Sequence, residues 1–545
     1  MPSTKPVKVT VVGGGAAGLT AAYFAAQSGA KVTVLERTKE AGKKILMSGG
    51  NRCNVLPAAV DLQTDFFTES SFSAMKAIFA SWSLEQCQDW LTDPDGIGLQ
   101  LELEEETGKM FPSSNSSREV RDKLLAACLR LGVVMKYSSS VEKVRMLSGE
   151  QSVRGTREPD HSTRQTALQS HLPIPDQVLA SHGGGGPDAG VRENGSSSSS
   201  VAVASVDAAT QWRCVLGDGS QLDSDCLVVA TGGLSFPAVG TDGTGHRVLK
   251  HLGHSLHEPY PALTPLTGAH PAGHQLAGLS LYDVQLSVHL PNVKKPKISP
   301  RTGLLFTHRG YSGPSILDLS HHAILSMRAG SSKPEQPSIA GMDGSSSSSS
   351  GSSSGSSKSP PAGLPEGTTM CVNWTNETEG VWTERLQAGG TAQVNNLLQR
   401  NGVRERLADA LCSELGLESK RLCELKRSER EALVRALTSY ELPVTGSEGY
   451  KKAEVSGGGV PLSELNCATM ESRKLPGLYL CGEVVDIFGR IGGFNFLAAW
   501  ITGRLAGLGA AGSLSKPVRT TESLGRIKTG RRGRGPIAAP AAVAV

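Results

Sequence analysis

Residues 8–54, KVTVVGGGAAGLTAAYFAAQSGAKVTVLERTKEAGKKILMSGGNRCN, decide the fold of this chain. Val7 to Val12 is an apolar run rich in β-branched residues, which is typical of a strand buried on both faces. An alanine-rich helical run from Leu19 to Gln27 follows, and then a second strand from Lys31 to Leu35. This order of elements predicts the first unit of a doubly wound α/β domain.

Three glycines and one acid make this unit a candidate dinucleotide-binding turn. Gly13 permits the tight turn, Gly15 admits a pyrophosphate close to the backbone, and Gly18 lets helix and strand touch. An acid after the second strand suits ribose hydroxyls, and the helix N-terminus offers N–H groups to phosphate. The predicted contacts are Gly13, Gly15, Ala16, Ala17, Gly18 and Glu36. A structural glycine turn is the alternative interpretation of an isolated GxGxxG. Here, however, a strand, the glycines, a helix, a second strand and the acid follow one another in the order of a dinucleotide-binding unit.

The loop after the acid indicates the size of the nucleotide. It contains Gly42 to Lys44 and then Ser48 to Asn54, a segment of small residues with one arginine, Arg52. Such a loop can lie along an extended diphosphate and reach the far ring of a larger cofactor. An ordinary surface loop is the alternative.

A second strand-and-glycine pattern occurs at residues 227–233. The apolar strand Leu227 to Ala230 runs into Thr231 and Gly232. Small residues at a strand end permit close approach of the backbone to a ligand. In flavin-dinucleotide proteins this is where the chain returns to the cofactor.

The last ordered segment, near the C-terminus, adds acids and a second helix N-terminus. A strand ends in a Gly-Glu pair, and a glycine-rich turn then leads into a helix that ends near Gly509. Reduced flavin collects negative charge on one ring edge, and a helix N-terminus stabilises such charge by about 0.3–1 kcal/mol when exposed. The predicted cofactor contacts here are Gly482, Glu483, Asp486, Gly492, Gly493 and Asn495.

Composition limits the classes of function. A chain of 545 residues can hold two or three domains, and a net charge of +4 gives no strong attraction to nucleic acid or membrane. Ten cysteines without a CxxC pair fit a reducing compartment. Because the first strand begins at Val7, no room remains for a leader, so we expect a cytoplasmic protein, or a plastid protein if the true start lies upstream. Phe494 to Ala511 is too short for a membrane span and carries Arg504.

Three segments are predicted to be disordered because they are rich in Gly, Ser, Pro or charge. They are the insert at 147–200, the insert at 327–365 and the basic tail at 513–545. We therefore divide the chain into a first part of the cofactor domain at 1–258, an inserted substrate domain at 259–452 with a helical piece at 393–437, and a second part of the cofactor domain at 453–512. We interpret Arg526 to Arg534 as a disordered end rather than an RNA contact.

Periodicity predicts several further elements. The predicted helices are Phe72 to Leu91, Arg118 to Leu131, Arg247 to Leu252 and Ser315 to Leu319. The predicted strands are Val133 to Tyr137, Val141 to Met146, Val201 to Val206, Trp212 to Leu216, Leu279 to Leu290 and Gly303 to Phe306.

The inserted domain contains a polar loop, Thr307 to Pro314, in front of a helix. Its His308 and Tyr311 are candidates for substrate contact or proton transfer. An ordinary helix start with Pro314 in the first turn is the alternative. The histidines between His246 and His257 are irregularly spaced and have no cysteine or acid cluster, so no metal site is predicted.

The combined motifs resemble the BaiN/YhiN-like FAD-dependent oxidoreductases, a family that includes the aminoacetone-oxidase type. The motifs that carry the resemblance are VVGGGAAGL, LERTKEAGKKILMSGGNRCN, FPSSNSSREV, ATGGLSFPAVGTDGTG, GLLFTHRGYSGP and AEVSGGGVPLSELNCATMESRKLPGLYLCGEVVDIFGRIGGFNF. The resemblance implies an α/β fold: a Rossmann-like FAD-binding domain assembled from both chain ends, with an inserted, mainly β substrate domain and a small helical subdomain.

The resemblance also extends the set of expected FAD contacts. The added positions are Arg37, Lys43, Ser48, Gly49, Arg52, Cys53, Asn54, Thr231 and Gly232. Two positions depart from the family pattern. Asn51 replaces a third glycine, which the turn should tolerate because Asn accepts positive φ, and Leu497 stands where relatives often carry Gln.

The predicted reaction is a redox reaction at the flavin N5, in which NAD(P)H is a transient reductant and a small molecule is the substrate. No second GxGxxG occurs between a strand and a helix, so a nicotinamide would bind over the flavin. His308, Tyr311 and Cys53 are the catalytic candidates. A flavin oxidase that uses oxygen, a flavin-bound sensor without turnover and an RNA-modifying flavoprotein are the alternatives, and the sequence leaves the oligomeric state open.

Overall fold

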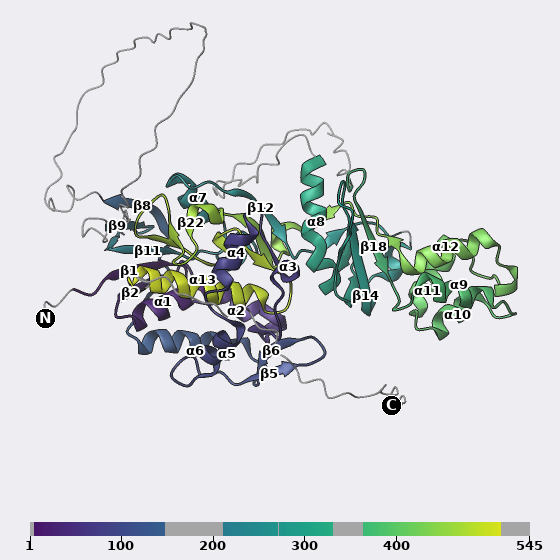
Figure 1. Cartoon of the computed structure of the whole chain (residues 1–545), viewed down its shortest axis with the longest axis horizontal. Coiled ribbons are helices and arrows are strands. Elements are labelled where there is room, and N and C mark those ends of the chain that lie inside the picture. Colours follow the sequence, from purple (N-terminus) through teal and green to yellow (C-terminus); the bar gives the residue numbers. More distant parts are fainter. Residues whose placement is uncertain (1–4, 148–210, 271, 331–362, 514–545) are drawn as a thin grey trace, which may run out of the picture.

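A computed structural model describes residues 5–147, 211–270, 272–330 and 363–513. The predicted strand Val201 to Val206, the basic tail after residue 513 and nearly all of the two predicted inserts lie outside these residues. The described chain forms a domain built from both chain ends, beside an inserted sheet and a group of helices (Figure 1). None of the described helices has the length and apolar character of a membrane span.

The central sheet of the first domain has seven strands in the order β22-β23-β24-β11-β1-β2-β7. The strands from β24 to β7 are parallel, while β22 and β23 form an antiparallel edge. Their bounds are β1 Lys8–Val12, β2 Lys31–Leu35, β7 Val134–Lys136, β11 Cys226–Val229, β22 Leu465–Asn466, β23 Glu471–Ser472 and β24 Leu478–Leu480. Because β24 comes from the C-terminal part and pairs with β11, both chain ends form one sheet.

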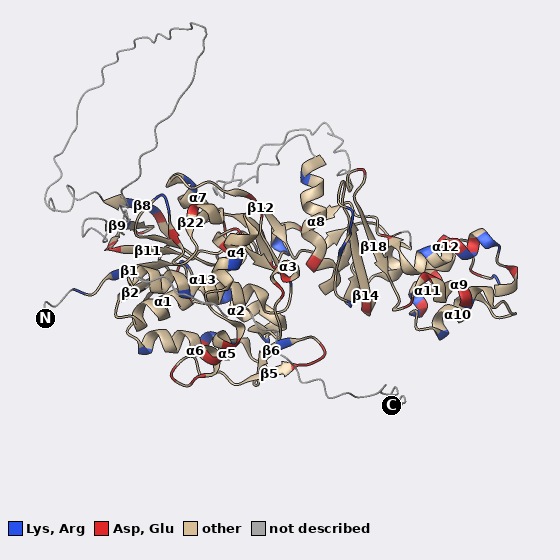
Figure 2. Cartoon of the chain, in the orientation of Figure 1, with Lys and Arg blue, Asp and Glu red and all other residues tan. Residues whose placement is uncertain are grey.

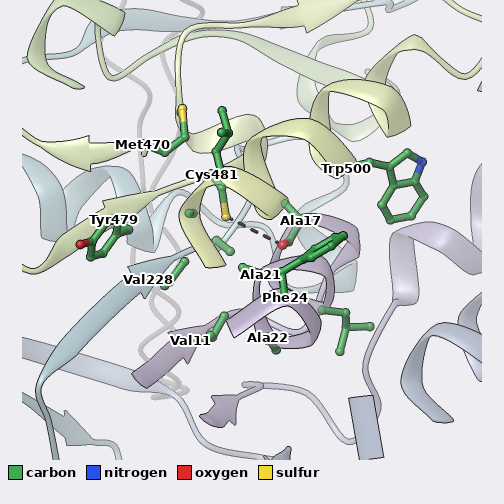
Figure 3. Close-up of a cluster of buried hydrophobic side chains, with 14 of the residues drawn as sticks. Val11, Ala17, Ala21, Ala22, Phe24, Val228, Met470, Tyr479, Cys481 and Trp500 are labelled. Carbon is green, nitrogen blue, oxygen red and sulfur yellow. Dashed lines mark hydrogen bonds between the residues drawn. The ribbon is translucent and has the colours of Figure 1, made fainter. Parts of the chain in front are cut away.

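Two helices from opposite chain ends pack on each other beside this sheet. They are α1, Ala16–Gln27, and α13, Phe494–Ala510. A Cβ on Gly503 would lie 2.6 Å from the carbonyl oxygen of Ala17, and one on Gly507 would lie 2.3 Å from that of Ala21. Glycines therefore allow these backbones to touch, and Figure 3 shows Ala17 and Ala21 within the buried cluster that also contains Trp500.

The remaining elements of this domain surround the central layer. The helices are α2 Lys43–Met47, α3 Leu62–Asp65, α4 Phe72–Phe79, α5 Leu84–Thr92, α6 Ser117–Arg130 and α7 Thr244–His251. The strands form three small sheets: β3 Leu56–Pro57 with β5 Leu101–Glu104 and β6 Lys109–Pro112; β8 Val141–Leu147 with β9 Gln211–Leu216 and β10 Gln221–Ser224; and β4 Phe66–Phe67 with β25 Phe488–Gly489.

The inserted domain is built on an eight-stranded antiparallel sheet, to which α8 is attached (Figure 1). Its strands are β13 Leu266–Thr267, β14 Ser280–His289, β15 Lys297–Ile298, β16 Thr302–Phe306, β17 Gly310–Ser312, β18 Thr369–Asn373, β19 Tyr440–Glu441 and β20 Gly446–Ser447. Its helices are α8 Pro314–Gly330, α9 Glu379–Gln387, α10 Val394–Arg400, α11 Glu405–Glu414 and α12 Arg427–Thr438. Charged residues of both signs cover the α9–α12 group (Figure 2).

Two antiparallel strands join the domains: β12, His257–Ala262, and β21, Val455–Gly459. A small apolar cluster lies at this junction, separate from the two main cores, and it contains Tyr260, Ile324 and Phe488. The inserted domain is therefore held to the cofactor domain by both chain connections and a packed contact.

Some predicted boundaries were wrong. The predicted helix Phe72 to Leu91 is two helices, because Ser83 starts the second one with a capping box in which it exchanges hydrogen bonds with Gln86. Leu147 belongs to β8 rather than to an insert, and residues 327–330 are the last turn of α8. The predicted helix Ser315 to Leu319 was accordingly too short.

Candidate functional site

A cavity of about 560 Å³ lies where β1, β2 and β11 end and where α1 and α13 begin. Parallel strands direct their carboxyl ends to one edge of the sheet, and an open α/β sheet binds its ligand there. Segments more than 400 residues apart in the chain, such as Gly13 and Gly493, line the same cavity. All predicted cofactor residues line it except Gly18, Cys53 and Asp486.

The three glycines of the first turn have different surroundings. Gly13 has φ +107°, and a Cβ there would lie 2.4 Å from the carbonyl oxygen of Ala230. A Cβ on Gly18 would lie 1.9 Å from the oxygen of Gly13, so Gly18 is a packing residue and not a cavity residue. A Cβ on Gly15 would meet no atom within 4 Å, which leaves open space beside the backbone for a phosphate.

Two helix N-termini face the cavity without a side-chain cap. Gly15 is the N-cap of α1 and Gly493 is the N-cap of α13, and neither helix start has a side-chain capping bond. The first N–H groups of a helix have no partner within it, and they carry the positive end of the helix dipole. Both ends can therefore bind negative charge on a ligand.

Glu36 is held in place at the end of β2. One carboxylate oxygen accepts a hydrogen bond from the Gly14 N–H at 2.9 Å, and the other accepts from the Thr38 N–H and hydroxyl, both at 2.8 Å. Each oxygen has two lone pairs, so Oε2 keeps one for a ligand hydroxyl. Arg37, next to it, forms an ion pair with Asp242 at 2.7 Å.

The loop at 48–54 turns sharply. Gly49, Gly50 and Asn51 have φ of 53°, 65° and 70°, which confirms that Asn51 adopts the positive φ expected of it. The Arg52 guanidinium lies 3.9 Å above the ring centre of Phe111. The same side chain donates to Asn115 at 2.7 Å and to Glu104 at 3.0 Å, so its orientation is fixed.

The structure removes the basis for treating Cys53 as a catalytic or cofactor residue. Its side chain is fully buried, and it does not line the cavity. Burial raises the pKa of the thiol to about 12, against a weaker opposing hydrogen bond with Ser48. A buried neutral thiol is a poor proton donor or nucleophile, so Cys53 serves as an apolar packing residue.

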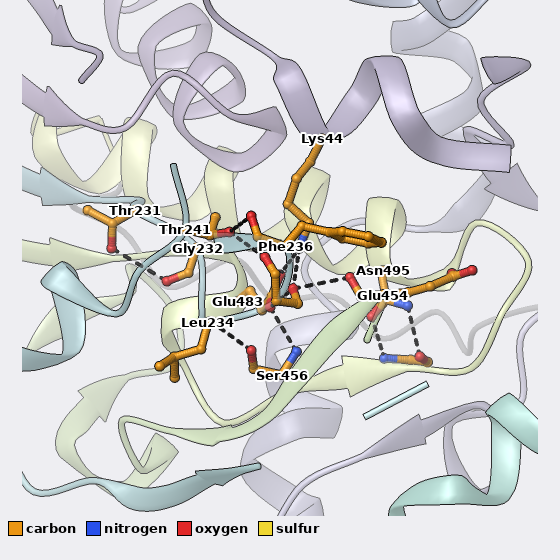
Figure 4. Close-up of polar contacts among 12 residues, drawn as sticks. Lys44, Thr231, Gly232, Leu234, Phe236, Thr241, Glu454, Ser456, Glu483 and Asn495 are labelled. Carbon is orange, nitrogen blue, oxygen red and sulfur yellow. Dashed lines mark hydrogen bonds and ion pairs between the residues drawn. The ribbon is translucent and has the colours of Figure 1, made fainter. Parts of the chain in front are cut away.

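Glu483 is the centre of a polar network that joins three segments of the cavity wall (Figure 4). Its carboxylate accepts from the Lys44 ammonium at 2.7 Å, the Ser456 N–H at 2.8 Å and the Ser235 hydroxyl at 3.0 Å. Burial raises the pKa of this carboxyl, but Lys44 and the hydrogen bonds outweigh burial and lower it overall. Glu483 therefore stays charged and fixes the wall.

Asp486 does not reach the cavity, contrary to the prediction. Its carboxylate is 1% exposed and accepts from the Thr68 hydroxyl at 2.9 Å and from the Ser70 N–H and hydroxyl at 2.8 and 2.7 Å. All these bonds involve one oxygen and tie the C-terminal part to the turn before α4. Asp486 is a structural link between distant segments.

His308 and Tyr311 are also displaced from the predicted site. They line a different cavity in the inserted domain, which shares no lining residue with the cofactor cavity. Tyr311 is fully buried, its hydroxyl donates weakly to the Pro443 carbonyl at 3.5 Å, and burial raises its pKa. Neither residue is placed to act on a group in the cofactor cavity.

Sequence reasoning missed several charged residues that line the cofactor cavity, among them Lys44, Lys109 and Glu454. Each lies beside a recognised motif, but nothing in the spacing shows which way its side chain points. No hydrogen bond or ion pair holds the carboxylate of Glu454 within the described part of the chain. Glu454 is exposed to the open cavity by surface area, yet the surrounding walls desolvate its carboxyl and raise its pKa, while Lys44 and Lys109 oppose the shift.

The residues fit FAD. Open space beside Gly15, two uncapped helix starts and a fixed acid after β2 suit a pyrophosphate and a ribose. Asn495 supports the glycine turn at the second helix, since its side-chain amide exchanges hydrogen bonds of 2.8 Å with both backbone groups of Gly489. Thr231 and Gly232 also line the cavity, as predicted.

Comparison with known proteins agrees with this geometry. The sequence profile described as HI0933-like protein Rossmann domain matches residues 7–171 and 190–509. Ribosomal RNA dihydrouridine synthase of Escherichia coli (strain K12) is 27% identical over 500 residues, which cover 90% of this chain and 94% of the relative. The 3-dehydro-bile acid delta(4,6)-reductase of Clostridium scindens is 25% identical over 508 residues, which cover 92% of this chain and 99% of the relative.

Among solved structures, 3-ketosteroid-delta4-(5alpha)-dehydrogenase from Rhodococcus jostii RHA1 covers 94% of this chain and 98% of its own, with 13% identity and a TM-score of 0.37. The sequence matches, and not this distant likeness, identify the protein as a flavoprotein oxidoreductase with a Rossmann FAD-binding fold. With a profile match that spans both parts of the cofactor domain and the inserted domain, the chain belongs to the HI0933-like protein Rossmann domain family.

Proposed function

We propose that this enzyme reduces a carbon–carbon double bond conjugated with a carbonyl group, using NAD(P)H as the reductant. The names of two relatives support this reaction class. Dihydrouridine differs from uridine by two hydrogen atoms across one conjugated ring double bond. A 3-dehydro-Δ4,6 compound likewise carries double bonds conjugated with its 3-keto group.

The reaction needs a hydride at one carbon and a proton at its neighbour. When bound, FAD supplies the two-electron chemistry, exchanging hydride at N5. NAD(P)H is oxidised to NAD(P)⁺, and the double bond is reduced. The chain itself must bind the substrate, deliver the proton and stabilise charge on the carbonyl oxygen.

Glu454 is the proposed proton donor. Its carboxyl lines the same cavity as the glycine turn, and no hydrogen bond or ion pair within the described residues occupies it. Desolvation by the surrounding cavity walls raises its pKa although the residue is open to the cavity, which increases the protonated fraction near neutral pH, as a general acid requires. Asp486 and Glu483, the neighbouring acids, are bound to other protein groups and are not available for this role.

Lys109 is the proposed partner of the substrate carbonyl. It lies at the start of β6 and lines the cavity, and its ammonium has no hydrogen bond or ion pair among the described residues. Negative charge develops on the carbonyl oxygen when hydride adds to a conjugated double bond, and a nearby cation stabilises it. Lys44 does not take this role because Glu483 and Ser235 already bind its ammonium.

The observation that carries the proposal is an acid and a lysine, both without a hydrogen bond or ion pair to any described residue, in the cavity that holds the dinucleotide-binding turn. The test is anaerobic stopped-flow absorbance of the yellow holoenzyme. NADPH or NADH should bleach the flavin, and 2-cyclohexen-1-one or an unmodified ribosomal RNA fragment should then restore its colour. Two relatives bear the ribosomal RNA name, so RNA is the first natural substrate to try.

Glu454→Gln tests the assigned proton donor. We expect NADPH bleaching to stay within about twofold of wild type, and recovery with the double-bond substrate to slow by about 100-fold. Wild-type recovery should slow as pH rises through the raised pKa of Glu454, and the variant should lose this dependence. Glu105→Gln, at an exposed acid between β5 and β6, is the matched control. Recovery only with oxygen would favour an oxidase and contradict the proposal.

A further inference from the structure

We propose that the inserted domain contains a second ligand site, a cavity that binds a phosphate ester. This cavity has a volume of about 340 Å³ and lies around the β16–β17 hairpin, within the range of roughly 300–1,000 Å³ that is usual for small-molecule sites. Its lining includes Thr267, His270, His274, His308, Arg309 and Thr445. No lining residue is shared with the cofactor cavity, so FAD does not account for it.

The polar side chains of this lining are donors without an acid among them. They comprise three histidines, one arginine, one tyrosine and three threonines, and no Asp or Glu lines the cavity among the described residues. Because the lining has no carboxylate, it does not repel an anion, and its side chains offer many N–H and O–H donors. A ligand with several acceptor oxygens fits this wall.

His270 supplies the strongest single indication of a missing acceptor. Its Nδ1 accepts the Ala272 N–H at 3.0 Å, so in the neutral ring the proton must be on Nε2. Burial lowers the pKa of this imidazole to about 4, which keeps it neutral. The residue is 6% exposed, and Nε2 has no hydrogen-bond partner within the described part of the chain. A buried N–H donor without an acceptor costs free energy that a ligand oxygen would recover.

The ring of His270 cannot turn easily to find a partner elsewhere. It stacks on Tyr440 with ring centres 5.3 Å apart, and the edge of Phe306 lies against it at 5.5 Å. Tyr440 is itself held by its hydroxyl, which donates to Glu414 at 3.0 Å. The donor is therefore held in a fixed place before a ligand arrives.

Arg309 combines a fixed backbone with an exposed, loosely paired guanidinium. Its N–H donates to the Thr307 hydroxyl at 3.2 Å, and its carbonyl accepts the Gly268 N–H at 3.0 Å. The side chain is 75% exposed, and its nearest acid, Glu448, is 3.9 Å away, which is too far for a hydrogen bond. A guanidinium in this condition can bind two phosphate oxygens at once.

The remaining donors surround the same space. The His274 and His308 rings are 6.2 Å apart, and the Thr267 and Thr445 hydroxyls are 3.4 Å apart. Arginine, imidazole and hydroxyl groups together match a tetrahedral oxyanion better than a neutral carbonyl. The volume leaves space for the group that carries the phosphate, which is why we infer an ester.

Isothermal titration of the FAD-saturated protein tests the site with four probes: UMP, the dinucleotide UpU, inorganic phosphate and uridine. FAD saturation keeps the probes off the dinucleotide-binding turn, and the cavity variants below separate binding at this second site from binding beside the flavin. We expect UMP or UpU to bind and uridine to show no binding. Binding of UMP alone assigns a monoester, and binding of UpU as well assigns a phosphate within a nucleotide chain. The proposal fails if uridine binds as well as UMP, or if no phosphate probe binds.

Arg309→Gln and His308→Gln locate the binding. Each substitution is at an exposed side chain and should weaken UMP binding by about tenfold or more, since hydrogen bonds to charged groups are the strong ones. Arg427→Gln, the same change at a side chain 88% exposed on α12, is the matched control and should leave the affinity unchanged. Circular dichroism melting checks that all variants fold. Unchanged UMP affinity in both cavity variants would overturn the proposal, whatever the fate of the proposed reductase activity.

Discussion

The cofactor cavity and the second cavity present different chemistry to a ligand. The first combines glycines and two helix N-termini, supplied by both chain ends, with charged side chains. The second is built from histidine, arginine and threonine side chains of one domain. Backbone recognition requires small residues at fixed spacing, whereas side-chain recognition can be assembled from unrelated segments.

The two cavities also differ in how firmly their polar groups are held. Glu36 and Glu483 in the first each accept three hydrogen bonds from protein groups. Arg309 and His308 in the second are exposed and loosely paired. A rigid wall suits a resident cofactor, because the protein loses little entropy on binding it. Exposed side chains suit a ligand that binds and dissociates readily.

The largest effect should come from the glycines of the first turn. Gly15→Val keeps the fold, since its Cβ meets no atom within 4 Å, but fills the space for the pyrophosphate. We expect FAD affinity to fall by at least about 100-fold, or ~2.7 kcal/mol, measured by FAD titration of the purified protein. Gly18→Val should fail to fold, because its Cβ would lie 1.9 Å from the Gly13 oxygen. A yellow Gly15→Val protein would contradict the backbone character of the cavity.

The next effect concerns the link between the two domains. Asp318 on α8 is buried, and its carboxylate accepts the Ile491 N–H of the cofactor cavity wall at 2.7 Å. Burial raises its pKa to about 7, against the opposing Ile491 bond and Arg490. Since the folded pKa lies above the unfolded value, its stabilising contribution is complete below about pH 4 and is lost as pH rises through about 7.

Asp318→Asn should therefore be more stable than wild type at pH 8, by up to about 4 kcal/mol, with the difference vanishing towards pH 4. The amide oxygen retains the bond to Ile491. Urea unfolding across this pH range measures the effect, with Asp89→Asn, at an exposed acid on α5, as the control. Lower stability of Asp318→Asn at pH 8 would show that the charged form is required at the domain junction.

A smaller effect is expected in the wall network. Lys44→Met removes the cation beside Glu483, whose side chain is 16% exposed, and should reduce the free energy of unfolding by about 2–3 kcal/mol. The double variant Lys44→Met with Glu483→Gln should recover part of this loss, because no unpaired charge remains. Lys43→Met, next in the chain and also lining the cavity, serves as the control. Equal losses for both lysines would contradict a specific ion pair.

The smallest effects are expected where the structure separates residues from the cofactor. Cys53→Ala and His308→Gln should each reduce the flavin with NADPH at a rate within about twofold of wild type, since neither side chain lines the cofactor cavity. Cys53→Ala should lower the melting temperature slightly, through a small buried void. A large loss of flavin reduction in His308→Gln would show that the two cavities are coupled.

Much of the fold was predictable because it rests on local patterns. Strand, glycine turn, helix and acid follow one another within residues 7–36, and the structure has β1, α1, β2 and Glu36 in that order. The helix break at Ser83 was missed, because apolar spacing continues across it and a capping box is a signal of only two residues. The strand β8 extends to Leu147 and the helix α8 to Gly330. These ends depend on packing, which amino-acid composition does not reveal.

The acids of the cofactor cavity show why the site was harder to predict. Glu483 and Asp486 are three residues apart in one glycine-rich segment, yet one lines the cavity and the other binds Thr68 and Ser70. The direction of each side chain depends on segments more than 400 residues away. Glu454 and Lys109 were missed for the same reason.

The sequence alone determined that a dinucleotide-binding α/β domain is formed from two distant parts of the chain, since spaced glycines and buried strands are local requirements of that backbone. Only the tertiary structure decided which side chains face the cofactor, that Cys53 and Asp486 are structural, and that His308 and Tyr311 belong to a second cavity. The physical reason is that these roles depend on burial and on contacts between remote segments, which a linear pattern does not contain.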